Sequence, residues 1–294
     1  MEADYQFDIS VIIVNYNTMD FLARCLNAVA SQTDADSEVI VVDNCSQDGS
    51  LELLREKFSW IRLIANDRNL GFSRANNQAL KICKGKYVYY LNPDTEVRPG
   101  AFRGVIDFMD SRPDVGLAGT RIINPDGSLQ SSVEKRYPGQ RYARQELKEL
   151  KGDIAWVLGA SMVARLQLIK ILEGFDESFF LYGEDLDLCL RVRKAGWIVA
   201  YIPEAVVVHW GGQSERNSLP VEVWKRKFMA ESLFYRKHYS QKAIRAIARA
   251  NLAQAYWRVL SISLTLPFSM NKEKTIAKLE KYKLVLKMLK DTNN

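Results

Sequence analysis

The chain has 294 residues, of which 47% are hydrophobic and 26% charged, so it can bury a substantial core and wholesale disorder is excluded. The net charge of +6 hides an asymmetry, because residues 1–215 hold 24 Lys/Arg and 30 Asp/Glu whereas residues 216–294 hold 17 and 5. Such a basic C-terminal segment predicts a polyanionic partner, either nucleic acid or an anionic membrane surface.

The first ninety or so residues alternate short apolar runs with helical patterns. The runs at 9–14, 39–42, 61–64 and 87–91 predict strands, and helices are expected between them, the third with Ser73 as a candidate N-cap. Almost continuously apolar strands alternating with helices predict a mainly parallel sheet covered on both faces, a Rossmann-like α/β fold. Neither G-x-G-x-x-G nor a P-loop pattern occurs, so the phosphates of a bound nucleotide would need another partner.

The pattern becomes less regular after a helix at about 101–109. Strands are expected at 115–118, 121–123, 156–163, 198–202 and 206–208, with a short helix at 166–172 and a mobile loop at 134–153. A loop dense in aromatic residues begins at Gly174 and runs into a helix whose first turn contains Glu184, Asp185 and Asp187. Carboxylates there are explained either by ordinary helix capping or by the placement of a general base.

Polar side chains follow two of the predicted strands directly. Asp43 and Asn44 come after the strand at 39–42, and Asn92-Pro93-Asp94 comes after the strand at 87–91. All of these residue types also favour simple turns. In an open α/β sheet, however, ligands collect at the carboxyl ends of the strands, so Asp94 is well sited for chemistry.

These pieces together resemble the inverting family 2 glycosyltransferases, especially bacterial rhamnosyltransferase-like members. The resemblance covers about residues 8–215 and depends on order and spacing, since each piece alone is a weak signal. It is carried by Val14-Asn15-Tyr16-Asn17, Val42-Asp43-Asn44, Asn69-Leu70-Gly71-Phe72, Leu91-Asn92-Pro93-Asp94, Gly159-Ala160, Glu184-Asp185-Leu186-Asp187 and His209.

The resemblance implies a nucleotide-diphosphosugar transferase fold that binds its donor at the carboxyl ends of the strands. Asp43 is similar to the carboxylate that reads the pyrimidine base. Asp94 is similar to the last residue of the family's D-x-D element, a ligand of Mg²⁺ or Mn²⁺, and His209 matches a further metal ligand. Asn92 stands where many relatives have Asp, which leaves the site one negative charge weaker. Further candidates for nucleotide-sugar binding, each also explained by turn or cap chemistry, are Asn15, Asn17, Arg68, Asn69, Asn76 and Asn92.

On the acceptor side, the resemblance assigns the catalytic base to Asp185. Glu184 is a neighbour that orients the acceptor or the loop, and capping is the preferred role of Asp187. Residues expected to contact the acceptor are Trp156, Gly159 and Tyr182; aromatic side chains suit a sugar-stacking wall, although they are more often part of a core.

The domain organisation expected is a catalytic domain at 1–215, with a nucleotide-sugar half at about 8–97 and an acceptor half at about 98–215. Residues 216–294 are expected to form a basic, amphipathic helical extension without a membrane span. Its last helix, at about 274–289, sets Ile276, Leu279, Tyr282, Leu286 and Leu289 against many lysines, as interfacial helices do. Either this segment contacts an anionic membrane, the preferred alternative, or it packs as a subdomain or a homodimer interface.

The leading functional hypothesis is a metal-dependent, inverting sugar transfer. The donor is a nucleotide-diphosphate sugar, with dTDP-rhamnose the candidate, and the acceptor is a glycan or a polyprenyl-linked glycan of cell-envelope polysaccharide. The four cysteines lack C-x-x-C spacing and the N-terminus is acidic and polar, which favours the cytoplasm, with peripheral contact at the inner membrane. The alternative is a non-catalytic module that binds membrane or nucleic acid through its tail, and the nucleic-acid partner is disfavoured.

Overall fold

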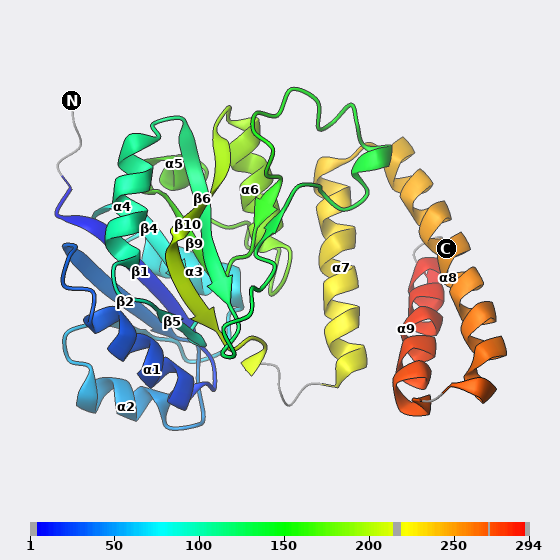
Figure 1. Cartoon of the computed structure of the whole chain (residues 1–294), viewed down its shortest axis with the longest axis horizontal. Coiled ribbons are helices and arrows are strands. Elements are labelled where there is room, and N and C mark those ends of the chain that lie inside the picture. The colour runs from blue at the N-terminus through cyan, green and yellow to red at the C-terminus, as the bar shows by residue number, and fades with distance from the viewer. Residues whose placement is uncertain (1–4, 214–218, 270, 292–294) are drawn as a thin grey trace. The chain divides into compact units, whose positions relative to one another are not determined.

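The computed structural model describes residues 5–213, 219–269 and 271–291, and the chain divides into two compact units (Figure 1). The first consists of residues 1–137 and 149–216, and the second of residues 138–148 and 217–294. The segment 138–148 therefore belongs to the second unit although it lies between two strands of the first.

The first unit is built on an eight-stranded mixed sheet in the order β3-β2-β1-β4-β9-β6-β10-β5. Most neighbours are parallel, whereas β9 runs antiparallel to both β4 and β6, and β5 runs antiparallel to β10. A separate two-stranded sheet pairs β7 with β8. The strands are β1 (Phe7–Asn15), β2 (Ser37–Asp43), β3 (Arg62–Ala65), β4 (Gly85–Leu91), β5 (Thr95–Val97), β6 (Val115–Ile123), β7 (Val133–Glu134), β8 (Trp156–Val157), β9 (Ser161–Arg165) and β10 (Ile198–His209).

Helices cover both faces of the sheet, which is why its central strands are apolar on both sides. Along β1, Ile9, Val11 and Ile13 face one helical layer, while Ile12 and Val14 face the other. The first layer contains α1 (Met19–Ala30), α2 (Ser50–Lys57) and α4 (Ala101–Ser111); the second contains α3 (Phe72–Leu80), α5 (Leu166–Ile171) and α6 (Glu184–Lys194). The predicted fold class is confirmed.

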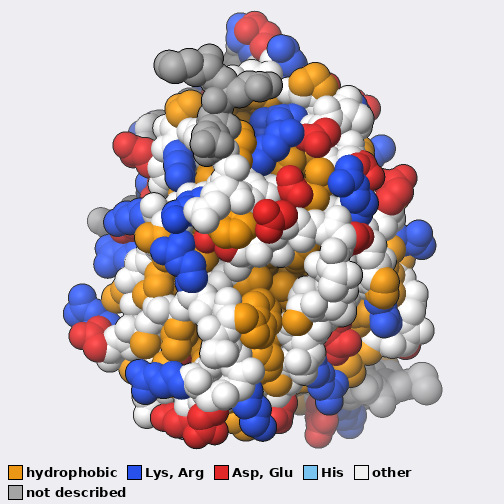
Figure 2. All heavy atoms as spheres, turned by 90° about the vertical axis from the view of Figure 1, so that its left-hand side faces the viewer, with side chains coloured by type: hydrophobic (Ala, Val, Ile, Leu, Met, Phe, Trp, Pro, Cys, Tyr) orange, Lys and Arg blue, Asp and Glu red, His pale blue; other side chains and the backbone are white. Residues whose placement is uncertain are grey.

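Charged side chains of both signs are interspersed on the face that Figure 2 shows, the left-hand side of Figure 1. Hydrophobic side chains reach the surface between them. Isolated apolar side chains at a surface are ordinary in folded proteins, so this face by itself indicates no partner.

The second unit is helical, with α7 (Pro220–His238), α8 (Gln241–Thr265), the 3₁₀ turn η3 (Leu266–Phe268) and α9 (Lys272–Asp291). The short 3₁₀ turn η1 (Gln140–Tyr142) comes from the 138–148 segment. This segment is held by hydrogen bonds from Tyr239 Oη to Pro138 O (2.7 Å) and from Ser240 N to Glu146 Oε1 (2.9 Å). Within the described parts of the chain, none of the helices is both long and apolar enough to cross a bilayer.

Several local expectations were wrong. Residues 156–163 form two strands, because Leu158 to Ala160 leave the ladder, whereas 115–123 and 198–209 are each one continuous strand. Ser73 does not cap α3, which begins after Gly71, and its hydroxyl is buried without a partner among the described residues. In α9, Leu279 and Leu289 are buried, so the face expected to lie on a membrane is partly used for packing.

Candidate active site

Asp43 ends β2 in a buried polar cluster beside the end of β1. Its Oδ1 accepts a hydrogen bond from Asn15 Nδ2 (2.9 Å) and its Oδ2 accepts one from the backbone N of Ser46 (3.0 Å). Thr18 Oγ1 donates to Asn15 Oδ1 (2.6 Å), which orients the amide toward the carboxylate. Parallel pairing of β1 with β2 sets Asn15 opposite Asp43, so the sheet itself positions the pair.

The other predicted donor-side residues lie in the loops around this cluster. Asn69 Oδ1 accepts from Asn44 Nδ2 and from Gly71 N (both 2.9 Å), so it organises its own loop. Asn17 adopts φ 54° and accepts from Gln47 N, while Asn76 donates to Phe72 O within α3. The three asparagine side chains thus each use at least one polar atom in a hydrogen bond within the protein. Arg68, in contrast, is exposed to solvent.

Gly71 links the donor-side loop to the aromatic loop that precedes α6. Its backbone has φ +84°, and the backbone N of Phe72 donates to Phe180 O (2.7 Å). A Cβ at Gly71 would lie 2.7 Å from a ring carbon and 2.8 Å from the carbonyl oxygen of Phe180, so glycine is required at this approach.

Asp94 and His209 come from different elements and meet at one end of the sheet. Antiparallel pairing of β5 with β10 sets His209 opposite Thr95, and His209 Nε2 lies 3.4 Å from Asp94 Oδ1. His209 Nδ1 lies 3.0 Å from Gln130 Oε1. Because an amide oxygen only accepts, Nδ1 donates to Gln130, and Nε2 faces the carboxylate of Asp94.

This arrangement fits a divalent cation. A ligating histidine usually donates its other ring N–H to an oxygen, as His209 does to Gln130. The buried Oδ1 of Asn92 has no hydrogen-bond partner among the described residues, so it is free to accept from a donor hydroxyl or a metal-bound water. The described residues hold no group of three or more His, Cys, Asp or Glu that could bind a metal by themselves. Proteins commonly bind Mg²⁺ through one or two side chains, and the phosphates of the substrate complete its coordination.

Glu184 and Asp185 begin α6, but their environments differ. Asp185 is half-buried, and its carboxylate accepts hydrogen bonds from Gly159 N (3.0 Å) and Leu186 N (2.8 Å). Glu184 is buried, and its Oε2 has no partner among the described residues. The chain enters α6 through Tyr182 (φ 71°) and Gly183 (φ 82°), two consecutive left-handed residues. That turn is costly for a tyrosine, as is often seen at functional sites.

The pKa values of the two carboxyl groups are shifted differently. Desolvation, followed by the charge of Asp185, raises the pKa of Glu184 to about 8. Desolvation also raises the pKa of Asp185, but its two backbone hydrogen bonds oppose that shift. Asp185 therefore ionises first, and Glu184 keeps its proton at neutral pH.

A two-residue segment connects the two carboxylate sites. The backbone N of Asn92 donates to Ala160 O (2.9 Å), while the neighbouring Gly159 N donates to Asp185. Gly159 is in close contact with Asp185, since a Cβ there would lie 3.3 Å from Asp185 Cβ. The turn that carries Asp94 and the helix that carries Asp185 are thereby held against the same short stretch of chain.

The remaining residues predicted to contact the acceptor are Trp156 and Tyr182. Trp156, in β8, packs partly against the core beneath α3, α5 and α6, and its buried indole N–H has no partner among the described residues. Tyr182 is half-buried. The buried Asp187 accepts a hydrogen bond at Oδ2 from Nε of the partly exposed Arg191 (2.7 Å), which forms an ion pair.

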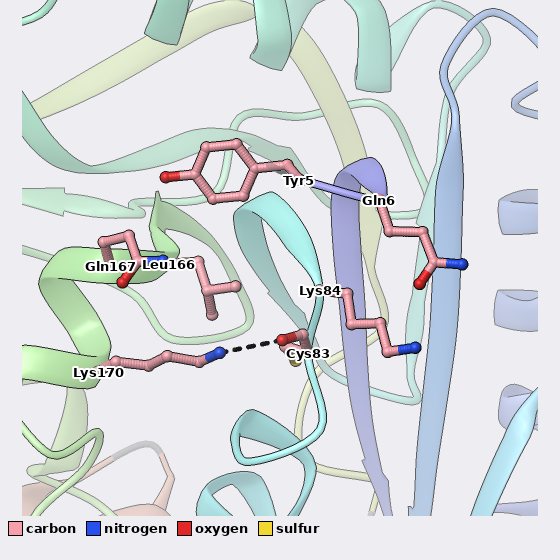
Figure 3. A pocket seen from close by; sticks show the side chains of 7 residues that line it. All are labelled: Tyr5, Gln6, Cys83, Lys84, Leu166, Gln167 and Lys170. Atoms are coloured by element: carbon pink, nitrogen blue, oxygen red, sulfur yellow. Dashed lines mark hydrogen bonds between the residues drawn. The ribbon is translucent and has the colours of Figure 1, made fainter. Parts of the chain in front are cut away.

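A pocket of about 560 Å³ in the first unit lies elsewhere (Figure 3). Its lining residues are Tyr5, Gln6, Cys83, Lys84, Leu166, Gln167 and Lys170. Tyr5 and Gln6 precede β1, and Cys83 and Lys84 precede β4, so the pocket opens at the amino ends of these strands. The seven residues of β4 separate it from the Asp94 turn by roughly 20 Å, which argues against it as the donor site.

Sequence reasoning missed the partners that orient the predicted residues. Gln130, which binds His209, lies in a loop with no local pattern. Ser46, which binds Asn15 and Asp43, looked like one member of a turn. Only long-range pairing reveals either role.

The mixed sheet between two helical layers is the nucleotide-diphosphosugar transferase fold. A solved mannosyltransferase of Pyrobaculum calidifontis, described in complex with GDP-Man and Mn²⁺, shares this fold with a TM-score of 0.60. That alignment covers 97% of this chain and 87% of the other at 17% identity.

The chain belongs to glycosyl transferase family 2, whose sequence model matches residues 10–167, and it is a glycosyltransferase. It is 28% identical over 229 residues to N-acetylglucosaminyl-diphospho-decaprenol L-rhamnosyltransferase of Mycobacterium tuberculosis, covering 68% of this chain and 75% of that one. It is 23% identical over 227 residues to the rhamnosyltransferase WbbL of Escherichia coli K12, covering 70% and 85%. The predicted family and enzyme class are confirmed.

Proposed function

We propose that this glycosyltransferase moves a sugar, with inversion, from a nucleotide-diphosphate donor to a lipid-linked glycan of the cell envelope. The observation that carries the proposal is the Gly159-Ala160 segment, which holds the Asn92–Asp94 turn and Asp185 against one stretch of backbone. A displacement needs one group near the leaving diphosphate and another near the attacking hydroxyl. This segment supports both sites at once.

Asp185 is the general base. The acceptor oxygen forms a bond to the anomeric carbon while the bond to the diphosphate oxygen breaks, and the hydroxyl proton passes to the Asp185 carboxylate. Its partial exposure and lower proton affinity than Glu184 support this assignment. Glu184 keeps its proton and acts as a hydrogen-bond donor that positions the acceptor or the loop.

The donor is held at the ends of β1, β2 and β4. Asp43 binds the pyrimidine base of the nucleotide by accepting its imide hydrogen, and Asn15 holds Asp43 in place through a hydrogen bond. Asn17, Arg68, Asn69 and Asn76 surround the ribose and diphosphate. Asp94 and His209 would hold a Mg²⁺ or Mn²⁺ ion, which would supply charge compensation for the leaving diphosphate. Asn92 offers its unpaired oxygen to the same region.

The proposed donor is dTDP-rhamnose, because two relatives that align over more than two thirds of the chain are described as rhamnosyltransferases. The name of the mycobacterial relative includes a diphospho-decaprenol acceptor, which supports a polyprenyl-linked acceptor here. Trp156, Gly159 and Tyr182 would line the acceptor side. Such an acceptor places the reaction at a membrane surface, on the cytoplasmic side where nucleotide sugars are made.

The test is release of free nucleoside diphosphate from a panel of UDP-, GDP- and dTDP-sugars, with Mg²⁺, Mn²⁺ or chelator. We expect slow hydrolysis of one donor without acceptor, dependent on metal and lost in Asp185→Asn. Asp187→Asn is the matched control, because it removes a carboxylate two residues away that is already paired with Arg191.

Two results would contradict the proposal. Donor binding without release, even with crude lipid-linked acceptor added, would indicate a non-catalytic module. Equal loss of release in the Asp185 variant and the folded Asp187 variant would mean that Asp185 has no special role as a base.

A further inference from the structure

The outer face of α8 carries a row of exposed apolar side chains. Trp257, Leu260 and Leu264 are 66%, 55% and 66% exposed, and Phe268, in the turn that follows, is 87% exposed. At 100° per residue the first three fall within about 60° of the helix circumference. Trp257 to Phe268 spans about 16 Å along the helix axis. We refer to these four residues as the α8 row.

Other parts of α8 are covered by the rest of the second unit. Ala255 is buried on the face opposite the α8 row. Ala243 and Ile247 are buried near the start of the helix, where Ile247 lies against Gly139 of the 138–148 segment and an added Cβ would approach it to 2.5 Å. Scattered exposed apolar residues need no explanation, but a continuous row on one helix face marks an interaction surface. The α8 row is therefore the part of this unit that requires a partner.

The charge around the row indicates which partner it is. α8 contains Lys242, Arg245, Arg249 and Arg258 and no acidic residue. α9 adds seven lysines against Glu273, Glu280 and Asp291. A second copy of the chain would bring the same excess of positive charge and would be repelled. A lipid surface with anionic headgroups supplies both an apolar layer for the row and negative charge for its cations.

We infer that the α8 row inserts into the headgroup boundary of an anionic bilayer, with Trp257 at the interface and the flanking cations on the headgroups. This moves the docking surface from α9, where periodicity alone placed it, to α8. The inference deepens the proposed function, since a lipid-linked acceptor is reached from that surface. It does not depend on the identity of the donor, because nucleoside diphosphate release from soluble donor is measured without vesicles.

The test is co-sedimentation of the full chain with vesicles of phosphatidylcholine and phosphatidylglycerol at 7:3, compared with phosphatidylcholine alone. We expect at least tenfold weaker partitioning to the neutral vesicles, and at least tenfold weaker partitioning of Leu260→Ser/Leu264→Ser to the anionic ones. Ile171→Ser is the matched control, because Ile171 is 77% exposed but lies in the first unit; it should bind within twofold of wild type.

Fluorescence gives a second readout. The anionic vesicles should shift tryptophan emission of the wild type to shorter wavelength, and Trp257→Phe should remove most of the shift. Unchanged donor hydrolysis and circular dichroism would show that the variants are folded. The inference fails if the wild type ignores anionic vesicles, if the double variant binds as tightly as wild type, or if that variant instead converts a dimer to a monomer.

Discussion

Replacing Glu184 by Gln should change how stability depends on pH. Glu184 is buried with one carboxyl oxygen unpaired, and burial raises its pKa from 4.5 to about 8. A carboxyl group with a raised pKa holds its proton more tightly in the folded state, so folding is favoured most below pH 4.5. That stability is lost as pH rises toward 8.

The size of the effect follows from that shift. At about 1.4 kcal/mol per pH unit, the shift corresponds to ~4 to 5 kcal/mol lost between about pH 4.5 and pH 8. Glutamine has nearly the same shape and no charge, so the variant should not show this loss. For a catalytic unit of this size, we expect the variant to melt at a temperature about 10 °C higher than wild type at pH 9, and close to wild type at pH 5.

The assay is thermal unfolding of both proteins from pH 5 to pH 9 in matched ionic strength. Glu177→Gln is the control, since Glu177 lies in the loop that leads into α6 but is about half exposed and pairs with the exposed Arg74. Its difference from wild type should stay nearly constant with pH. Parallel melting curves for wild type and Glu184→Gln across the whole range would refute the conclusion that Glu184 is buried and protonated.

Four further variants test the remaining parts of the site. Asp185→Asn should lower turnover by at least 10²-fold with donor affinity unchanged, measured by nucleoside diphosphate release and donor titration; weakened donor binding would contradict a role on the acceptor side. Asp187→Asn should cost ~1 to 2 kcal/mol in denaturant unfolding, because it weakens a charge-assisted hydrogen bond to Arg191, which is partly exposed and keeps its bonds to Leu172 O and Gly174 O; unchanged stability would refute the ion-pair role. Gln130→Leu should raise the metal concentration needed for half-maximal activity by about 10- to 100-fold through His209, and an unchanged metal titration would exclude this second contact. Gly71→Ala should destabilise by at least ~1 kcal/mol in the same unfolding assay, since its φ of +84° and close approach admit no side chain; a neutral result would mean that the loop relaxes.

The sequence predicted the strands that are apolar on both faces and missed what depends on distant pairing. Of the first four strands, β1, β2 and β4 are buried between two helical layers, and their composition indicates a mainly parallel sheet. The insertion of β9 between β4 and β6 brings together residues 85–91, 161–165 and 115–123. No local pattern encodes that order. The apolar face of α9 was predicted from its period, but period shows only that a face is apolar and not what covers it.

In the candidate site, too, local motifs could be predicted and long-range contacts could not. Asp43, Asn92, Asp94 and Glu184-Asp185 could be found because each follows a strand or begins a helix within a motif. Their environment could not be predicted, because it comes from backbone groups and from side chains more than twenty residues away in the sequence. Gln130 reaches His209 across 79 positions, and Gly159 reaches Asp185 across 26.

Three carboxylates in one turn of α6 illustrate why residue type alone does not assign a role. Asp187 is neutralised by Arg191, whose guanidinium also donates to the carbonyls of Leu172 and Gly174, so it anchors the turn before the aromatic loop. Glu184 has no cation in hydrogen-bond contact among the described residues and keeps a proton. Asp185 receives two backbone N–H groups, enough to favour its charge but not to neutralise it. Only this third environment leaves a partly exposed carboxylate with a lone pair for an incoming hydroxyl, which is why the base is assigned there.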